Sequence, residues 1–561
     1  MLIGRLLCII TVLGAASPVR AQSPDTILVG GRIITLDERS TIAEAMAIRG
    51  DRIMAVGRAS DIRKIAGERT RVIDLAGRTV IPGLIDSHIH AIRAGLRFGR
   101  EVSWIGSPSI ADAMGRLRDA ASRIPKGDWI VVAGGWTPQQ FTERRLPTQA
   151  DLMSAAPNHP VYIQLFYTAV LLTPAGFEKL GIKSDTDVPP RGTIQRRADG
   201  RPTGWIHGKA PTITGLYNRL SPPTLEQSIE GTRGFFRALN RFGLTGVIDP
   251  GGYNLAPEQY QALFRLWRRR GLTMRVAYSV SAPNRGRELA DYQTLTRFLP
   301  MGTGDDWLRF NGIGERVTWG MNNNPDPSAA DKEAYYRIGV WAAERGMTLT
   351  MHWPQDSSVH HLLDLFDRID RTVPFRGLRW SVAHLHDASL TSLRRMKALG
   401  LGWLMQNRLY FANTRSLLLH GDALARTPPL KSAIGMGLRI GGGTDAHRVM
   451  DYNPFLSLRW MIDGLTVEGV ETRNAAELPT REQALRIYTA GSAWFAHDEQ
   501  RRGALMVGRL ADLAVLNRDY VTVPTRQIGA IQSLLTMVGG RIVYAAGPYK
   551  ALEAPVPKRL E

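Results

Sequence analysis

The first residues that could do chemistry are two histidines at the end of an apolar run, in the stretch VIPGLIDSHIH (residues 80–90). In a β-strand, residues i and i+2 point to the same side of the sheet. His88 and His90 could therefore direct both imidazoles at one metal ion. A bare His-x-His pair is more often a chance surface pair, so the interpretation depends on ligands from elsewhere in the chain.

Four further residues with metal-binding side chains stand at the ends of other apolar runs, and these are Glu315, His352, His384 and Asp445. With the first pair they offer imidazole nitrogens and carboxylate oxygens but no thiolate. That set suits Zn²⁺ and, less specifically, Mn²⁺, Fe²⁺ or Co²⁺. Each histidine alone would more often be structural. Their joint occurrence at strand ends predicts a site for one or two divalent ions, with Zn²⁺ favoured.

The elements that must position these residues are apolar runs that alternate with amphipathic segments, which favours a parallel α/β arrangement. After the run that ends in the two histidines, the candidate strands lie at residues 244–252, 273–280, 308–315, 347–353, 378–386, 401–407 and 438–447. Eight such units predict an α/β fold of the (β/α)8 TIM-like barrel type, in which chemistry sits at the C-terminal ends of the strands. A block at about 100–240 interrupts the pattern after strand 1 and is predicted to be an insertion at the barrel mouth.

The two ends of the chain differ from this middle. Both contain short β-rich runs separated by Gly-Gly and Gly-Asp turns, which are typical of hairpins. We therefore predict one small composite β-sandwich domain built from residues 22–84 and 498–561, with the barrel at 85–497. A chain of 561 residues has room for both domains.

The first 21 residues have the pattern of an export signal. Arg5 precedes an apolar stretch at 6–16 that is too short to span a membrane, and Val19 and Ala21 are the small residues that signal peptidase requires. We predict cleavage after Ala21 and a periplasmic or secreted protein. Cys8, the single cysteine, lies inside this segment, so the mature chain would have no disulfide and no thiolate ligand.

The formal net charge of +20 invites a nucleic-acid interpretation. The arginines are scattered, however, and no basic run exceeds the three at 268–270, so we predict no nucleic-acid partner and only a weak preference for anionic surroundings. No stretch after residue 20 is apolar enough to span a bilayer, and no stable membrane insertion is predicted.

The motifs resemble those of the metal-dependent amidohydrolase superfamily, in the branch of N-substituted formamide deformylase and YtcJ-like proteins (amidohydrolase family 3). The stretches that carry the resemblance are VIPGLIDSHIH, AGGWTPQQF, TLTMHW, WSVAHLH, GGGTDAH and YTAGSAWFAHDEQRRGALMVGRLADLAVLN. The resemblance covers nearly all of residues 26–545. The first-strand and Gly-x-Leu-Ala-Asp-Leu motifs are specific, whereas the single histidine matches are weaker.

This resemblance implies roles for the ligand residues. His88 and His90 would bind the more buried metal ion. His352 and His384 would bind a second ion or complete a single site. Asp445 would be a ligand and also the catalytic general base that takes a proton from water and passes it to the leaving group.

The sequence departs from many family members at the fourth strand, where they use a carboxylated lysine to bridge two metal ions. The matching stretch, RFNGIGE, has no lysine, so Glu315 could bridge directly or could be a salt-bridged residue of the barrel rim. Lys209, in PTGWIHGKA, is the other candidate for a carboxylated lysine. A further departure is LFYTA (165–169), where this branch often has an Asp-Gly-His segment, and it puts the relatives' substrate in doubt.

Four more residues flank the motifs and are candidates for substrate contact, namely Trp136, His207, Trp353 and His447. A tryptophan is usually a core residue, but several near one pocket would favour an apolar or aromatic small-molecule substrate. The sequence does not specify the oligomeric state, and a homo-oligomer is compatible with it.

These observations predict an exported metal-dependent hydrolase that cleaves a carbon–nitrogen bond of an amide, a formamide or a cyclic amide with metal-activated water. The same site could hydrolyse an ester or a lactone, since it would attack either carbonyl. A third alternative is a non-catalytic regulatory or binding protein that retains the fold. Six intact ligand positions argue against that alternative, because a decayed site should have lost some of them.

Overall fold

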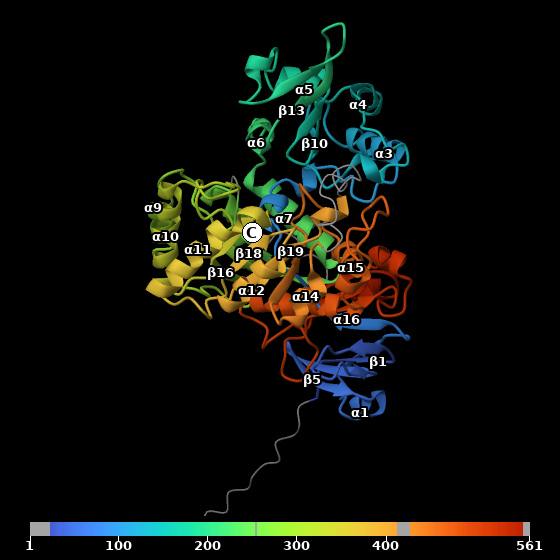
Figure 1. The fold of residues 1–561 in the computed structure, drawn as a ribbon. Helices are drawn as coiled ribbons and strands as arrows, with labels where there is room; N and C mark the ends of the chain where they lie inside the picture. Colours follow the sequence, from blue (N-terminus) through green and yellow to red (C-terminus); the bar gives the residue numbers. More distant parts are fainter. Residues whose placement is uncertain (1–22, 253–254, 412–426, 554–561) are drawn as a thin grey trace, which may run out of the picture.

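The computed structural model describes residues 23–252, 255–411 and 427–553. The predicted export signal lies outside these ranges. Within them, every helix is too short or too polar to cross a membrane. Figure 1 shows a central α/β body, with one group of elements projecting from it at the top and β1 and β5 at the opposite end.

All eight predicted strands of the central body are present and parallel. The first sheet has the order β16-β15-β14-β8, and its strands are β8 (Leu84–Asp86), β14 (Leu244–Asp249), β15 (Arg275–Val280) and β16 (Leu308–Ile313). The second has the order β17-β18-β19-β20, and its strands are β17 (Thr350–Trp353), β18 (Ser381–His384), β19 (Gly402–Gln406) and β20 (Arg439–Gly443).

Backbone hydrogen bonds connect the two sheets along both pairs of edges. The Ile313 N–H donates to the Thr348 carbonyl (3.0 Å), beside β16 and β17. The Ser87 N–H donates to the Gly442 carbonyl (2.9 Å), beside β8 and β20. The first and last parallel strands therefore lie next to each other, which brings their C-terminal ends together.

Helices between the strands cover the sheets, because each buries an apolar face against them. They are α7 (Leu225–Asn240), α8 (Gln261–Arg268), α9 (Glu288–Leu295), α10 (Ala329–Glu344), α11 (Asp356–Thr372), α12 (Leu390–Ala398) and α14 (Leu430–Gly435). The start of α10 shows why a helix begins where it does. Ser328 accepts from the Asp331 N–H, and Asp331 accepts from the Ser328 N–H, a capping box that satisfies two free donors.

The block after strand 1 forms a separate five-stranded sheet of order β12-β13-β11-β10-β9. Its strands are β9 (Ile130–Val132), β10 (Val161–Leu165), β11 (Ala169–Leu172), β12 (Thr193–Arg196) and β13 (Pro202–His207). The helices with it are α3 (Ile110–Ala121), α4 (Gln149–Ala155), α5 (Pro174–Lys179) and α6 (Ala210–Asn218). Figure 1 shows this insertion as the projecting part. Helix α7, within the predicted limits of 100–240, instead packs on α2 (Ala91–Gly95), α8 and β14 of the central body.

Two further sheets lie in the terminal module, one built from N-terminal residues alone and one built from both chain ends. One, of order β5-β4-β1-β6, contains β1 (Thr26–Val29), β4 (Ala45–Arg49), β5 (Arg52–Gly57) and β6 (Arg71–Asp74), with α1 (Ala59–Lys64) packed on it. The other, of order β23-β22-β21-β7-β2-β3, contains β2 (Arg32–Ile34), β3 (Ile42–Ala43), β7 (Thr79–Pro82), β21 (Leu513–Leu516), β22 (Ser533–Val538) and β23 (Arg541–Ala545). β7 pairs with β21, which joins the two ends of the chain, and one apolar cluster takes residues from both sheets.

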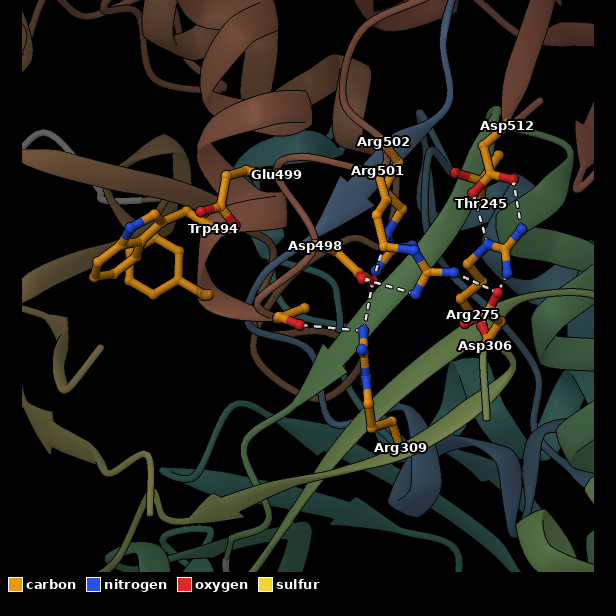
Figure 2. A network of polar contacts seen from close by, with 12 residues as sticks. Thr245, Arg275, Asp306, Arg309, Trp494, Asp498, Glu499, Arg501, Arg502 and Asp512 are labelled. Atoms are coloured by element: carbon orange, nitrogen blue, oxygen red, sulfur yellow. Dashed lines mark hydrogen bonds and ion pairs between the residues drawn. The ribbon is translucent and has the colours of Figure 1, made fainter. Parts of the chain in front are cut away.

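A network of arginines and aspartates connects this terminal module to the N-terminal ends of the parallel strands (Figure 2). Arg309 of β16 and Arg502 both bond Asp498, at 2.7 Å and 3.0 Å. Arg275, the first residue of β15, binds Asp512 at 2.8 Å. The network lies at the opposite ends of the strands from the residues predicted to do chemistry, so we assign it to stability.

Candidate metal centre

The six predicted ligand residues lie together at the C-terminal ends of the parallel strands. His88 and His90 follow β8, Glu315 follows β16, His352 lies in β17, His384 ends β18 and Asp445 follows β20. The close approach of β8 and β20 depends on Gly443. A Cβ atom there would lie 2.7 Å from the backbone nitrogen of His88, so the absence of a side chain lets the two ligand-bearing loops meet.

One triad consists of His88, His90 and Glu315, whose ligand atoms lie within 4.8 Å of one another. The Nε2 of His88 is 3.2 Å from Oε2 of Glu315, and the Nε2 of His90 is 3.2 Å from its Oε1. All three side chains are buried. Two imidazole nitrogens and a carboxylate therefore face one point away from solvent.

A second triad consists of Glu315, His352 and His384. The Oε2 of Glu315 is 3.1 Å from Nδ1 of His352 and 3.4 Å from Nε2 of His384. Glu315 thus belongs to both triads, and its two oxygens face histidines from three different strand ends. Its carboxylate therefore lies where the two groups of histidine nitrogens meet.

Asp445 lies beside the first triad. Its Oδ1 is 3.2 Å from Nε2 of His90 and 3.8 Å from Nε2 of His88. The backbone of Asp445 has φ +57° and that of His384 has φ +73°. Left-handed backbone is unfavourable for residues other than glycine and gathers at functional sites. Both residues turn sharply at the end of a strand.

The electrostatics of the centre hold both carboxylates in their charged form. Burial would raise the pKa of Glu315, but the charges of His352, His88 and His90 outweigh it and hold that pKa well below its usual range. Burial likewise opposes ionisation of Asp445, yet its contact with His90 and the charge of His384 lower its pKa to about 2.

The pKa values of His90 and His384 shift in opposite directions. Burial and the charge of Arg93 would lower the pKa of His90, but Glu315 and Asp445 outweigh them and raise it to about 10. Burial, followed by the charge of His352, lowers the pKa of His384 to about 4. The carboxylates thus draw positive charge to the first triad, where a cation would replace the proton on His90.

Sequence reasoning missed two aspartates that hold the ligands in place. Asp86 accepts from the Thr444 hydroxyl (2.6 Å) and from the His88 N–H (3.1 Å), so it connects the strand-1 loop to the strand-8 loop. Burial raises the pKa of Asp86 to about 7. Asp249 accepts from the Gly251 N–H (3.0 Å), and the Gly251 carbonyl accepts from Nδ1 of His90 (3.0 Å). Their position at the ends of β8 and β14 was the available signal.

The two tryptophans predicted to contact substrate are packed inside the protein. Trp136 is fully buried in the core of the insertion, and its indole donates to the Gln164 carbonyl at 2.8 Å. Trp353 is buried in the core of the central body and donates to the Ser358 hydroxyl at 3.2 Å. These contacts explain both residues as core residues, and substrate contact stays a prediction for them.

The remaining predicted residues lie outside the two triads. His207 is exposed on β13 and stacks on Trp205, and Lys209 is exposed just before α6. His447 is buried with its Nε2 2.7 Å from a Glu101 oxygen. The place shared by the two triads is taken by Glu315, so the structure gives Lys209 no bridging position.

The donor set fits a divalent cation. Neither ring nitrogen of the fully buried His88 makes a hydrogen bond in the described part of the chain, although its Nε2 lies 3.2 Å from a Glu315 oxygen. Leaving a buried ring nitrogen without a hydrogen bond is costly. His90 donates from Nδ1 to a backbone carbonyl, which leaves Nε2 free to bind a cation, the usual arrangement of a metal-binding histidine. Nitrogen and oxygen donors from five strand ends thus converge as a metal site requires.

The model of the amidohydrolase family matches residues 71–544 of this chain. The Protein LONG AFTER FAR-RED 3 of Arabidopsis thaliana is 25% identical, over 95% of this chain and 94% of that protein. The N-substituted formamide deformylase of Arthrobacter pascens is 23% identical, over 93% of this chain and 99% of that enzyme.

Solved structures show the same fold. An uncharacterized metal-dependent hydrolase from Pyrococcus furiosus has a TM-score of 0.63 at 21% identity, over 89% of this chain and all of that one. The atrazine chlorohydrolase TrzN from Arthrobacter aurescens TC1, solved with zinc, has a TM-score of 0.53 at 17% identity, over 95% of this chain and 97% of that one. The chain therefore belongs to the amidohydrolase family, and it is a metal-dependent hydrolase that acts on carbon–nitrogen bonds.

Proposed function

We propose that this protein hydrolyses an amide, a formamide or a cyclic amide at a centre of two divalent metal ions that share Glu315. The single observation that carries the proposal is that Glu315 belongs to both triads of ligand atoms. Zn²⁺ is the ion we favour, because the donors are imidazoles and carboxylates and because the neighbour TrzN was solved with zinc. We further propose that the two parallel sheets form one closed barrel and that the terminal module is a β-sandwich.

His88 and His90 would hold one ion and His352 and His384 the other, with Glu315 common to both. When bound, a divalent cation polarises a carbonyl oxygen and activates water at neutral pH. The walls of the site exclude solvent, since four of these five side chains are almost fully buried. A substrate carbonyl placed here would meet little competition from bulk water.

Asp445 is the residue we assign to proton transfer. Its pKa of about 2 keeps it ionised at neutral pH, so its carboxylate can accept a proton. It lies beside His90 at the edge of the first triad, with its side chain 18% exposed, whereas Glu315 is enclosed. Asp445 can therefore take a proton from the attacking water and deliver it to the leaving nitrogen.

Export is a separate part of the proposal. It depends on the pattern of residues 1–21, with Arg5, an apolar stretch and small residues before Gln22. We propose a periplasmic or secreted location for the mature enzyme, acting on a small molecule rather than on a nucleic acid.

The experiment that tests the proposed reaction is a substrate panel with zinc- and manganese-loaded enzyme. Amides, formamides, cyclic amides, esters and lactones are supplied, and product and bound metal are measured on the same preparation. We expect two metal ions per chain and turnover of a carbon–nitrogen substrate. Turnover restricted to esters or lactones would refute the assignment to a carbon–nitrogen bond.

Variants identify the site in the same experiment. His88→Ala and His90→Ala should each lose at least one equivalent of metal while the protein stays folded. The matched control is His360→Ala, since His360 is exposed on α11 and outside both triads. Unchanged metal content in the double variant His88→Ala/His90→Ala would show that the centre lies elsewhere.

A further inference from the structure

Two buried arginines follow metal-ligand residues closely in the sequence. Arg93 comes three residues after His90, in α2, and Arg448 comes three residues after Asp445, in the loop after β20. Arg93 is 8% exposed and Arg448 is 4% exposed. Arginine is the side chain that most rarely loses its charge, so two positive charges are held inside the protein.

Neither guanidinium has a conventional partner in the described residues. No hydrogen bond or ion pair joins either one to a described side chain or carbonyl, and the Nε of each is buried without an acceptor. Arg448 stacks over the ring of Tyr217, 3.8 Å from its centroid. Glu101 and the neighbouring tyrosines favour the charged form of Arg448, but the buried Nε–H donors of both arginines stay without an acceptor. Burying a donor without an acceptor is costly, so an oxyanion that enters here would gain these hydrogen bonds.

The nearby carboxylates are already engaged by other groups. Glu101 accepts from the Tyr217 hydroxyl and lies against His447, at 2.7 Å in each case. Asp249 accepts from the Ile92 N–H (2.8 Å) and the Gly251 N–H (3.0 Å). These two groups temper the positive charge without binding either arginine.

Both arginines line one cavity of about 390 Å³, between the central body and the end of α6. Arg97 also lines it, held by the carbonyls of Leu220 and Ser221. Tyr217, Leu96 and Pro222 are among the apolar walls, and the acidic lining residue Glu258 is exposed. Volumes of this order are typical of small-molecule sites.

The charges of both arginines and of His90 act on the hydroxyl of Tyr167. Burial would raise the pKa of its hydroxyl, but the charges of Arg93, Arg448 and His90 outweigh that effect and lower it. The charges of both arginines and of His90, a residue of the first triad, thus act on one phenol. Tyr167 belongs to LFYTA (165–169), the segment in which the sequence departs from its branch of the family.

We propose that Arg93 and Arg448 bind an oxyanion of the substrate, a carboxylate or a phosphate, while its carbon–nitrogen bond lies at the metal centre. The inference depends on the proposed function and narrows its substrate class to acidic amides, such as N-acyl or N-formyl amino acids. A guanidinium binds either oxyanion with two parallel hydrogen bonds. The surplus of basic residues over the whole chain would draw such substrates toward the cavity.

The test compares substrates that differ only in the anion. N-formylphenylalanine and N-formylphenethylamine share the ring and the formamide, and the second lacks the carboxylate; an N-formylaminoalkyl phosphate tests the other oxyanion. We expect kcat/KM for one acidic substrate to exceed that of the neutral one at least tenfold, which is about 1.4 kcal/mol. The acid that shows the preference identifies the oxyanion.

Variants then locate the preference. Arg93→Gln and Arg448→Gln should each reduce the ratio of kcat/KM between acidic and neutral substrate by about 10- to 100-fold, mainly through KM, because a charge-assisted hydrogen bond is lost. Arg69→Gln is the matched control, since Arg69 is exposed in the terminal module, and its ratio should be unchanged. Arg448→Lys keeps the positive charge but loses the two parallel N–H donors of the guanidinium. The ratio should therefore fall less than in Arg448→Gln.

A binding measurement separates this inference from the proposed reaction. Calorimetric titration of N-acetylphenylalanine and of inorganic phosphate into metal-free protein should show binding by the wild type that Arg93→Gln and Arg448→Gln weaken at least tenfold. Turnover of the neutral and acidic formamides at equal kcat/KM would overturn the pocket and leave the proposed function intact. Binding of the acid without turnover of any substrate would support the oxyanion site and refute the proposed function. If a glutamine variant fails to fold, the wild-type ratio and Arg448→Lys still decide.

Discussion

At the scale of single residues, the centre depends on Glu315. Many members of the family that this chain resembles use a carboxylated lysine at the fourth strand, so the question is which residue takes that place here. The structure answers with a carboxylate whose Oε1 faces His90 and whose Oε2 faces the other three histidines. In the proposed centre, Glu315 would supply the negative charge directly, without carbon dioxide, because its carboxylate belongs to both triads of ligand atoms.

Substitutions of Asp445 and of Glu315 should therefore have different effects on bound metal and on turnover. Asp445→Asn keeps the size and can still offer an oxygen, but it cannot accept a proton at neutral pH. We expect bound metal to be largely retained while kcat falls by about 10²–10⁴-fold, the usual value of general acid–base catalysis. Glu315→Gln removes charge from between two cations, so metal occupancy should fall first and activity with it.

Metal analysis and kinetics on the same two preparations make this comparison. If Asp445→Asn keeps turnover near that of the wild type on a substrate for which chemistry limits the rate, Asp445 is not the proton acceptor. Full metal occupancy in Glu315→Gln would show that the carboxylate does not bridge.

At the scale of elements, the contact between β8 and β20 determines whether the ligands meet. The Asp445 N–H donates to the His88 carbonyl (2.8 Å), and Asp86 binds Thr444 from the other side. The backbones approach this closely because position 443 is a glycine. The first and last strands of the α/β body are therefore held in register by the same loops that carry the ligands.

Gly443→Ala should disturb this contact. The added Cβ would lie 2.7 Å from both the backbone nitrogen and the Cβ of His88, and such overpacking costs about 1–3 kcal/mol. We expect a lower free energy of unfolding in urea and reduced metal occupancy. In the control, Gly435→Ala, the new Cβ meets nothing within 4 Å near the end of α14, so stability should be unchanged or rise by up to about 1 kcal/mol. Full metal content in Gly443→Ala would contradict the argument.

At the scale of the whole molecule, the arginine–aspartate network of Figure 2 joins the terminal module to the central body. Asp498 is 3% exposed and contacts Arg309, Arg501 and Arg502. Burial would raise the pKa of Asp498, but these arginines outweigh it and lower the pKa below its usual value. The folded state thus favours the charged carboxylate more than the unfolded state does.

Asp498→Asn should lower the free energy of unfolding at pH 7 by about 3–5 kcal/mol, because it leaves buried arginines without their counter-charge. A lowered folded pKa contributes stability that is present above the unfolded value of about 4 and is lost as the pH falls below it. The difference between wild type and variant in urea unfolding should therefore shrink from pH 6 toward pH 3. Asp119→Asn, at an exposed position on α3, should change stability by less than about 0.5 kcal/mol. A difference independent of pH would exclude this role for Asp498.

The predicted export signal can be tested on the whole protein from its native host. If the signal is cleaved after Ala21, N-terminal sequencing of the protein from its native host should begin at Gln22 or close to it, in the periplasmic or secreted fraction. The apolar stretch and the small residues before the site are the physical reason. A protein that begins at Met1 in the cytoplasm would refute this prediction.

The sequence by itself determined the parallel strands and the residues at their ends. Buried strands are apolar and bounded by turns, and the C-terminal ends of parallel strands meet on one side. Six residues could therefore be grouped without coordinates, namely His88, His90, Glu315, His352, His384 and Asp445. The family motifs added their roles. Local patterns carried this information because each motif lies within one strand and its loop.

Only the tertiary structure decided which groups face one another. It placed Glu315 rather than Lys209 between the triads, packed Trp136 into the insertion core, and put Arg93 and Arg448 at one cavity although 355 positions of sequence numbering separate them (93 to 448). Such contacts depend on packing between distant segments, which no periodicity in the chain encodes. A buried donor without an acceptor is likewise invisible in the sequence, because burial is a property of the whole fold.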